Sequence, residues 1–149
     1  MPNDEFFMRE ALALARQAET KGEVPVGAVI VIDGEVRGRG CNAPISRNDP
    51  TAHAEMMAIR EAAAAIGNYR MEDATLYSTL EPCVMCAGAL VAARVGKLVF
   101  GARDLRFGGV RSKFRLADSE LLNHRVEIVE GILAGDCLVL VKRFFEQRR

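Results

Sequence analysis

Residues 79–86 read Thr-Leu-Glu-Pro-Cys-Val-Met-Cys, and they form the junction between an expected strand, residues 75–79, and an expected helix. Pro82 suits the first turn of that helix, because the N–H group that proline lacks would have no partner there. Cys83 and Cys86 are three residues apart, so they share one face at the start of the helix. This stretch therefore predicts two thiol groups presented together at a strand-to-helix boundary.

A second stretch, residues 51–55, reads Thr-Ala-His-Ala-Glu and opens an alanine-rich segment that predicts a helix from about residue 51 to residue 66. His53 and Glu55 fall in the first turn of this helix. Side chains of a helix tilt toward its N-terminus, so both can reach a metal ion placed just beyond that end. The partial positive charge of a helix N-terminus also lowers the pKa of a thiol, and thiolate is the form that binds zinc.

The rest of the chain alternates helices and strands after an opening hairpin. Expected helices cover residues 4–20, 51–66, 82–93 and 133–146, and expected strands cover residues 24–32, 35–41, 75–79, 97–102 and 126–129. Asp33-Gly34 favours a two-residue hairpin turn, Gly38 and Gly40 indicate a close approach or a bulge, and residues 118–124 are a candidate for a further short helix. The pattern predicts an α/β fold, a sheet with helices packed on both faces, as one domain over residues 1–149.

The composition is that of a globular protein, because half of the 149 residues are hydrophobic. The N-terminus carries Asp4 and Glu5 where a secretory signal would be basic. The longest apolar run, residues 24–32, is too short to span a bilayer. We therefore expect a cytoplasmic protein with no membrane association. In that compartment a C-x-x-C pair more often binds metal or performs redox chemistry than forms a disulfide.

Positive charge gathers in one part of a chain whose formal net charge is zero. Residues 94–115 contain a single acidic side chain, Asp104, among the basic side chains Arg94, Lys97, Arg103, Arg106, Arg111, Lys113 and Arg115. A segment of this kind fits a face that binds a polyanion. It fits a solvated surface equally well.

The two motifs together favour a catalytic metal site over a structural one. His53, Cys83 and Cys86 supply three zinc ligands and leave a fourth position open, as catalytic zinc sites do. Water in such a position has its pKa lowered from about 15.7 to about 7, and Glu55 is left free to transfer protons. A closed structural site would need a fourth Cys or His, and the spare residues have no paired ligand spacing; they are Cys41, Cys137 and His124.

In these motifs and their flanks the chain resembles the bacterial tRNA-specific adenosine deaminases of the cytidine deaminase-like superfamily. The matching segments are residues 23–29, 41–45, 49–55, 79–88, 99–104 and 123–127. The resemblance implies a three-layer α/β/α fold with a five-stranded mixed sheet. It also implies a homodimer with one Zn²⁺ per subunit that converts the wobble adenosine, A34, of a tRNA anticodon stem-loop to inosine.

The resemblance also implies a role for individual residues. His53, Cys83 and Cys86 would bind zinc, and Glu55 would shuttle protons. The residues expected to meet the substrate are Asn42 at the flipped nucleoside, Val26 and Ala54 around the base, Asp104 at the neighbouring nucleotide, and Arg103 and Arg106 facing the anticodon loop. The final helix offers Leu138, Val141, Phe144 and Phe145 as candidates for the core, although an exposed aromatic such as Phe145 could stack on a splayed base.

One segment departs from the family pattern. After Arg103-Asp104 the family is expected to show a lysine followed by small residues, approximately Lys-x-Gly-Ala-x-Gly-Ser. Residues 105–112 instead read Leu-Arg-Phe-Gly-Gly-Val-Arg-Ser. The length of the loop, Gly108 and Ser112 match the family pattern, whereas the new side chains are bulkier and more basic. RNA binding is still expected, with altered contacts to the anticodon loop.

Two other functions are compatible with parts of the sequence. The same zinc chemistry would serve a deaminase of a free base or nucleotide, such as guanine, cytosine or deoxycytidylate, and the zinc motif does not separate that function from tRNA deamination. A zinc-stabilised binding module without catalysis is the third function considered. Glu55 argues against it, since a purely structural site needs no such carboxylate.

Overall fold

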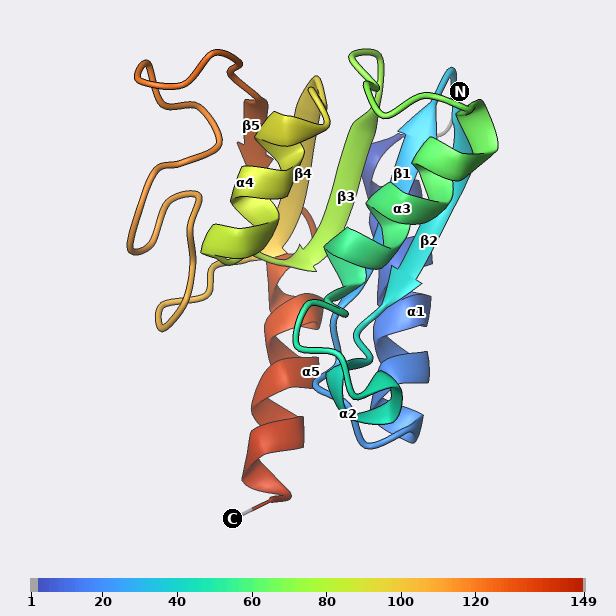
Figure 1. The fold of residues 1–149 in the computed structure, drawn as a ribbon. Coiled ribbons are helices and arrows are strands. Elements are labelled where there is room, and N and C mark those ends of the chain that lie inside the picture. The colour runs from blue at the N-terminus through green and yellow to red at the C-terminus, as the bar shows by residue number, and fades with distance from the viewer. Residues whose placement is uncertain (1–2, 149) are drawn as a thin grey trace.

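A five-stranded sheet forms the middle layer of the computed structural model, which describes residues 3–148 (Figure 1). The strands are β1 (Gly27–Ile32), β2 (Glu35–Cys41), β3 (Thr75–Leu80), β4 (Lys97–Ala102) and β5 (Glu127–Glu130), and the helices are α1 (Asp4–Thr20), α2 (Pro44–Arg47), α3 (Ala54–Ile66), α4 (Val84–Ala92) and α5 (Ala134–Glu146). The strand order is β2-β1-β3-β4-β5. Strand β1 is antiparallel to β2 and β3, whereas β3, β4 and β5 are parallel. The expected mixed sheet is thus confirmed.

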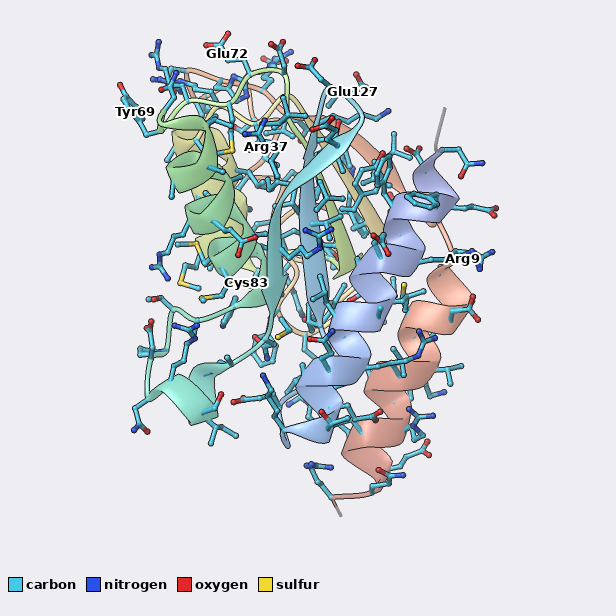
Figure 2. All side chains as sticks on the ribbon, turned by 90° about the vertical axis from the view of Figure 1, so that its right-hand side faces the viewer. Arg9, Arg37, Tyr69, Glu72, Cys83 and Glu127 are labelled. Carbon is cyan, nitrogen blue, oxygen red and sulfur yellow. The ribbon has the colours of Figure 1, made fainter. Side chains whose placement is uncertain are left out.

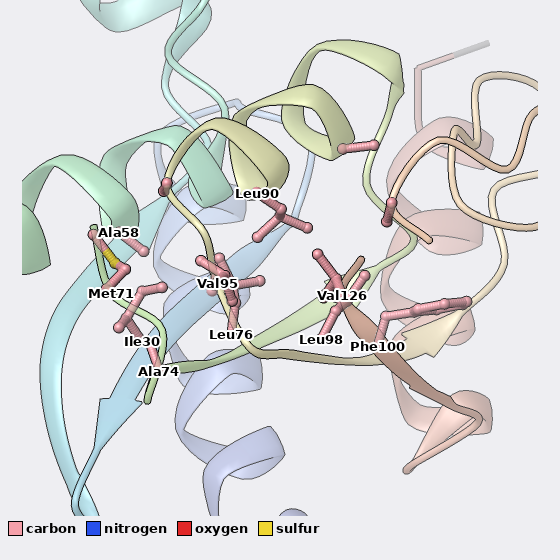
Figure 3. Packing of buried hydrophobic residues seen from close by; sticks show 14 of the residues in the cluster. Ile30, Ala58, Met71, Ala74, Leu76, Leu90, Val95, Leu98, Phe100 and Val126 are labelled. Atoms are coloured by element: carbon pink, nitrogen blue, oxygen red, sulfur yellow. The ribbon is translucent and has the colours of Figure 1, made fainter. Parts of the chain in front are cut away.

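Helices cover both faces of the sheet, as the alternating pattern predicted. Helices α3 and α4 lie on one face, and α1 and α5 lie side by side on the other (Figure 2). Successive strand residues point to opposite faces. Ile30 packs with Ala58 of α3 and Leu90 of α4 (Figure 3), while Val29 packs on the opposite face with Met8 of α1. Each large apolar side chain buried in this way contributes about 1.5–3 kcal/mol to folding.

The hairpin that opens the sheet has the predicted turn. Asp33 and Gly34 both have positive φ values, 53° and 77°, which match the right-handed twist of the two strands. The glycines of β2 have the close approach that the sequence indicated. A Cβ atom at Gly38 would collide with the carbonyl oxygen of Ala58, and one at Gly40 with that of Ala54. Helix α3 therefore rests directly on the backbone of β2.

Several element boundaries differ from the sequence prediction. Strand β1 begins at Gly27, not at residue 24, because Pro25 has no N–H group and the Val26 N–H donates to the Val24 carbonyl in a tight turn. Helices α3 and α4 begin two to three residues later than expected, so His53 and Cys83 are N-cap residues. Residues 42–50, which lie between an expected strand and an expected helix, contain the one-turn helix α2.

The short helix expected over residues 118–124 is absent from the described chain, which forms turns there. The hydroxyl of Ser119 accepts a hydrogen bond from the N–H of Leu121, and the carbonyl of Ser119 accepts one from Leu122. Leu121 is 94% exposed, so a helix here would have no apolar face to bury. Among the helices of residues 3–148, none combines the length and apolar character that crossing a bilayer requires.

Candidate active site

The expected metal ligands gather where two helices begin. His53 is the N-cap of α3, Cys83 is the N-cap of α4, and Cys86 lies in the first turn of α4. In Figure 2, Cys83 lies at the lower end of the layer formed by α3 and α4, whereas Tyr69 and Glu72 lie at the opposite end. Because α4 directly follows β3, the cluster sits beyond the carboxyl end of that strand, the usual place for a site in such a fold.

The geometry of the cluster fits a zinc ion. The Nδ1 atom of His53 lies 3.5 Å from the Sγ atom of Cys83 and 3.7 Å from that of Cys86. In a tetrahedral site with ordinary Zn–N and Zn–S bonds, the nitrogen and sulfur atoms are about 3.6 Å apart. All three donor atoms lie within 4.8 Å of one another, and no further His, Cys, Asp or Glu of residues 3–148 joins this group. One imidazole and two thiols are therefore arranged as three of four tetrahedral ligands.

The two cysteines have different pKa values before a metal binds. Hydrogen bonds from Cys86 and then from His53 lower the pKa of Cys83 to about 4, although burial opposes this shift. The pKa of Cys86 is raised, first because its thiol is hydrogen-bonded to the sulfur of Cys83 and second because it is buried. The pKa of His53 is raised mainly by its hydrogen bond with Cys83. A lowered thiol pKa favours the thiolate, which is the form that a zinc ion requires.

Glu55 lies beside the cluster with its side chain almost completely buried, at 4% exposure. Burial raises the pKa of its carboxyl group to about 7. A divalent cation bound nearby would lower this pKa. A carboxyl group with a pKa near the working pH is suited to both accepting and donating a proton.

A cavity of about 790 Å³ opens over this cluster. Most of the substrate-contacting residues expected from the sequence line it, namely Val26, Asn42, Arg103, Asp104, Arg106 and Phe145, together with His53, Glu55 and Cys83. Ala54 is different, because it is fully buried and packs in the core with Ala58 of the same helix. A contact between Ala54 and a base therefore stays a prediction.

The basic segment that was expected to face RNA is partly neutralised by ion pairs. Arg103 makes two hydrogen bonds with the carboxylate of Glu130, at 2.8 and 3.0 Å. Arg111 is held in the same way by Asp118, at 3.1 and 2.9 Å. Arg106 instead lies over the ring of Phe107, with its guanidinium carbon 5.4 Å from the ring centre. Of these three arginines, Arg106 is the one whose charge faces the cavity without an acidic partner among the ion pairs of residues 3–148.

The final helix divides its apolar residues between the core and the cavity. Phe144 is buried at 4% exposure, whereas Phe145 is 44% exposed and lines the cavity. Leu138 and Val141 were candidates for the core, but Leu138 is also 44% exposed and both line the cavity wall. A cavity wall needs apolar side chains just as a core does, so helical periodicity alone does not separate the two.

Sequence reasoning missed Glu81, a buried carboxylate at the rim of the same cavity. Its hydrogen-bond donors lie 23 to 31 residues further along the chain. A glutamate before a proline carries no local signal for such partners. The available hint was its position at the end of an apolar strand, where an unpaired carboxylate would be costly.

The comparison with known families agrees with this geometry. The family described as the cytidine and deoxycytidylate deaminase zinc-binding region matches residues 1–102. The matched region contains all three donors of the cluster and Glu55. The class of protein is therefore a zinc-dependent deaminase.

Curated relatives narrow this class. The tRNA-specific adenosine deaminase of Haemophilus influenzae is 49% identical over 147 residues, which cover 98% of this chain and 85% of that protein. The tRNA-specific adenosine deaminase of Bacillus subtilis is 48% identical over 149 residues, which cover 100% of this chain and 92% of that protein. With identity at this level over nearly its whole length, the chain belongs to the tRNA-specific adenosine deaminase family.

Solved structures give the same assignment of fold. A structure from a study of A-to-I editing by tRNA:A34 deaminases at the wobble position superimposes with a TM-score of 0.87 at 42% identity, covering 90% of this chain and 97% of that one. Guanine deaminase from Nitrosomonas europaea has a TM-score of 0.82 at 22% identity, covering 97% of this chain and 85% of that one. The second likeness concerns the fold alone.

Proposed function

We propose that this chain hydrolyses the wobble adenosine, A34, of a tRNA anticodon loop to inosine and ammonia. The observation that carries the proposal is a single cavity lined by His53 and Cys83 of the donor cluster together with Glu55 and Asn42. The relatives named for tRNA-specific adenosine deamination support the same substrate.

In this proposal, His53, Cys83 and Cys86 hold the zinc ion, which supplies the Lewis acidity that allows hydrolysis at neutral pH. The chain's own groups manage the protons. Glu55 accepts a proton from the attacking water and delivers it to the ring nitrogen next to the carbon under attack. It then carries the second proton of that water, from the hydroxyl added to the carbon, to the amino group, which leaves as ammonia while the carbonyl of inosine forms. Its burial keeps bulk water from competing for that proton.

The cavity also explains how adenosine would be held. Val26 offers an apolar wall against a base, and the amide of Asn42 can both donate and accept hydrogen bonds. The N–H of Asn42 donates to the carbonyl of Val26 at 3.0 Å, so the two residues keep a fixed relative position. Together they would orient a flipped nucleoside with its amino group toward Glu55.

The outer part of the cavity favours RNA over a free base. Its mouth is surrounded by exposed apolar side chains and by an arginine that has no ion-pair partner among residues 3–148; they are Leu105, Arg106, Phe107, Leu138 and Phe145. Single-stranded RNA loops are bound by stacking bases on such side chains, with phosphate contacts from arginine. A free base would fill only part of a cavity of about 790 Å³ and would not use this rim.

The direct test compares substrates. The zinc-loaded protein is incubated separately with an A34-containing tRNA, free adenosine, cytidine and guanine, and the products are identified by mass. We expect inosine only in the tRNA, at position 34. Release of ammonia from guanine or cytidine at a comparable rate, with the tRNA unchanged, would replace the proposal by free-base deamination.

The two adjacent phenylalanines of α5 provide a matched pair of variants. Phe145→Ala is expected to weaken binding of the anticodon stem-loop by about 1–3 kcal/mol, or about 5- to 150-fold in Kd, because it removes a stacking surface. Phe144→Ala is expected to lower the free energy of unfolding by about 3–5 kcal/mol, because it removes a buried ring. Fluorescence anisotropy and chemical denaturation measure the two effects. Equal RNA affinity in the wild type and Phe145→Ala would show that Phe145 is not part of the RNA-binding surface.

We also propose that the protein is a cytoplasmic homodimer. The family resemblance implies both properties, and exposed apolar side chains such as Val84 at the start of α4 and Phe114 in the segment between β4 and β5 offer surface for a second copy. Light scattering is expected to give twice the mass of one chain. A single-chain mass at assay concentration would contradict the dimer, and recovery of the protein outside the cytoplasmic fraction would contradict the location.

A further inference from the structure

Glu81 gathers an unusual number of hydrogen bonds from one distant loop. Its side chain is 2% exposed. Its Oε2 atom accepts hydrogen bonds from the N–H groups of Val110 at 3.1 Å, Arg111 at 2.7 Å and Ser112 at 2.9 Å. Its Oε1 atom accepts one from the N–H of Asp104 at 3.1 Å and another from the hydroxyl of Ser112. These five donors all lie in the loop of residues 104–112, which we call the rim loop.

The charge of Glu81 is stabilised by these hydrogen bonds and not by a direct ion pair. No lysine or arginine of residues 3–148 forms an ion pair with it. A buried carboxylate without a cation depends on its hydrogen bonds, so the rim loop and the charge stabilise each other.

The rim loop is also joined to the segment that carries a zinc ligand. Gly108 forms an isolated β-bridge with Cys83, and the N–H of Gly109 donates to the carbonyl of Pro82 at 2.8 Å. Neither glycine has room for a side chain. A Cβ atom at Gly108 would collide with the Glu81 carboxyl group, and one at Gly109 would lie 2.8 Å from the Val84 backbone. The loop therefore lies directly against residues 81–84.

We infer that Glu81 is a positioning residue that holds the rim loop at a fixed place over the zinc cluster and thereby sets RNA affinity. This inference rests on the proposed function. The rim loop supplies Asp104, Leu105, Arg106 and Phe107 to the cavity. Glu81 itself lies two residues before Cys83, so one carboxylate links the RNA-facing side chains to the metal-binding turn.

The same contacts account for the departure of residues 105–112 from the family pattern. Four of the five donors to Glu81 are backbone N–H groups, which any residue except proline provides. The positions whose side chains matter to this arrangement are Gly108 and Ser112, the two that match the family pattern. The side chains of Leu105, Arg106 and Phe107 make no contact with Glu81 among its hydrogen bonds, so they can vary on an unchanged backbone. They are therefore the specificity-determining part of the rim loop.

The test replaces Glu81 by glutamine, which has the same shape but turns an NH₂ group toward N–H donors. It is made in a Glu55→Gln background so that bound RNA is not converted. We expect Kd for the anticodon stem-loop to rise at least tenfold relative to Glu55→Gln alone, with one zinc ion per chain retained. Hydrogen exchange at the amides of residues 110–112 is expected to accelerate, while exchange within α4 stays slow.

A kinetic comparison separates positioning from a general loss of structure. In active protein that keeps Glu55, the single variant Glu81→Gln is expected to raise KM for the stem-loop at least tenfold. Its kcat is expected to change by less than about threefold. A merely structural role would lower kcat and zinc content in proportion to the fraction unfolded and would leave KM unchanged. That second pattern would overturn the inference.

Two milder variants keep the inference testable if Glu81→Gln does not fold. Ser112→Ala removes one of the five hydrogen bonds and is expected to raise Kd about two- to fivefold. Its matched control is Ser78→Ala, which removes a buried hydroxyl that donates to the Leu80 carbonyl at 2.7 Å and makes no hydrogen bond with the rim loop. The control is expected to leave Kd unchanged. Equal Kd values for Ser112→Ala and the wild type would count against Glu81 as the anchor.

The double variant Leu105→Ala/Phe107→Ala tests the other half of the inference. Exchange at residues 110–112 is expected to stay slow and zinc content to stay full, because Glu81 still holds the backbone of the rim loop. The Kd for the stem-loop is expected to rise, because the side chains that contact RNA are gone. Fast exchange at residues 110–112 in this variant would show that the side chains themselves hold the loop. If the Glu55→Gln protein binds no stem-loop at all, the proposed function fails, and the exchange rates still report on Glu81 separately.

Discussion

Replacing Glu55 by glutamine is expected to lower kcat on the anticodon stem-loop by about 100- to 10,000-fold, the range that general acid–base catalysis contributes. The reason is that Glu55 is the buried carboxyl group beside the donor cluster, with a pKa raised by burial to about 7. Glutamine has nearly the same shape but neither accepts nor delivers the proton. Zinc content is expected to stay at one ion per chain, because Glu55 is not one of the three donors.

Three measurements on purified Glu55→Gln check this expectation: single-turnover kinetics, metal analysis and RNA anisotropy. A matched control is Glu61→Gln, the same chemical change on the same helix, at an exposed site where the carboxylate accepts the Arg39 N–H. Its kcat is expected to stay within about twofold of the wild type. Full activity in Glu55→Gln would assign proton transfer to another group, and loss of zinc would make Glu55 a ligand.

Replacing either Cys83 or Cys86 by serine is expected to reduce bound zinc below a tenth of an ion per chain and to abolish turnover. A serine hydroxyl is not ionised at neutral pH, so it does not replace a thiolate ligand. Zinc at a thousand times its Kd stabilises the folded state by about 4 kcal/mol. For a chain of this length that corresponds to about 8–16 °C in Tm, at about 2–4 °C per kcal/mol.

Metal analysis and thermal unfolding with and without added zinc measure both effects. Cys41→Ser provides the control, because Cys41 is a partly exposed free cysteine outside the donor cluster, and its zinc content and Tm are expected to match the wild type. A chelator added to the wild-type protein is expected to lower Tm by the same amount as the ligand variants. Unchanged zinc content in Cys83→Ser or Cys86→Ser would refute the ligand assignment.

The features that the sequence predicted correctly depend on short-range patterns. Asp33-Gly34 specifies a hairpin turn through its own backbone preferences, and the apolar runs of β1 and β4 specify buried strands. The ligand motifs were predictable for the same reason, since each is a short segment at the start of a helix. Their meeting at one point follows once α3 and α4 pack on the same face of the sheet.

The features that the sequence did not predict depend on partners far along the chain. Arg103 is paired with Glu130, 27 residues away, so its charge could not be assigned to the RNA-facing surface or to an ion pair in advance. Glu81 depends on amides of a loop whose side chains carry no signal for it. Leu138 was predicted to lie in the core but lines the cavity, because the sequence pattern of an apolar residue is the same in both places.

The glycines of β2 have a consequence for the metal site. Helix α3 carries His53 and Glu55, while Cys83 and Cys86 belong to α4, so the distance between the imidazole and the two sulfur atoms is set by how far each helix stands from the sheet. Gly40 allows the first turn of α3, at Ala54, to touch the strand backbone. The relative placement of the three donor atoms therefore depends on the spacing between the helix layer and the sheet. The edge strand β2 thus acts as a spacer, because it helps to set how far the imidazole carried by α3 stands from the two sulfur atoms carried by α4.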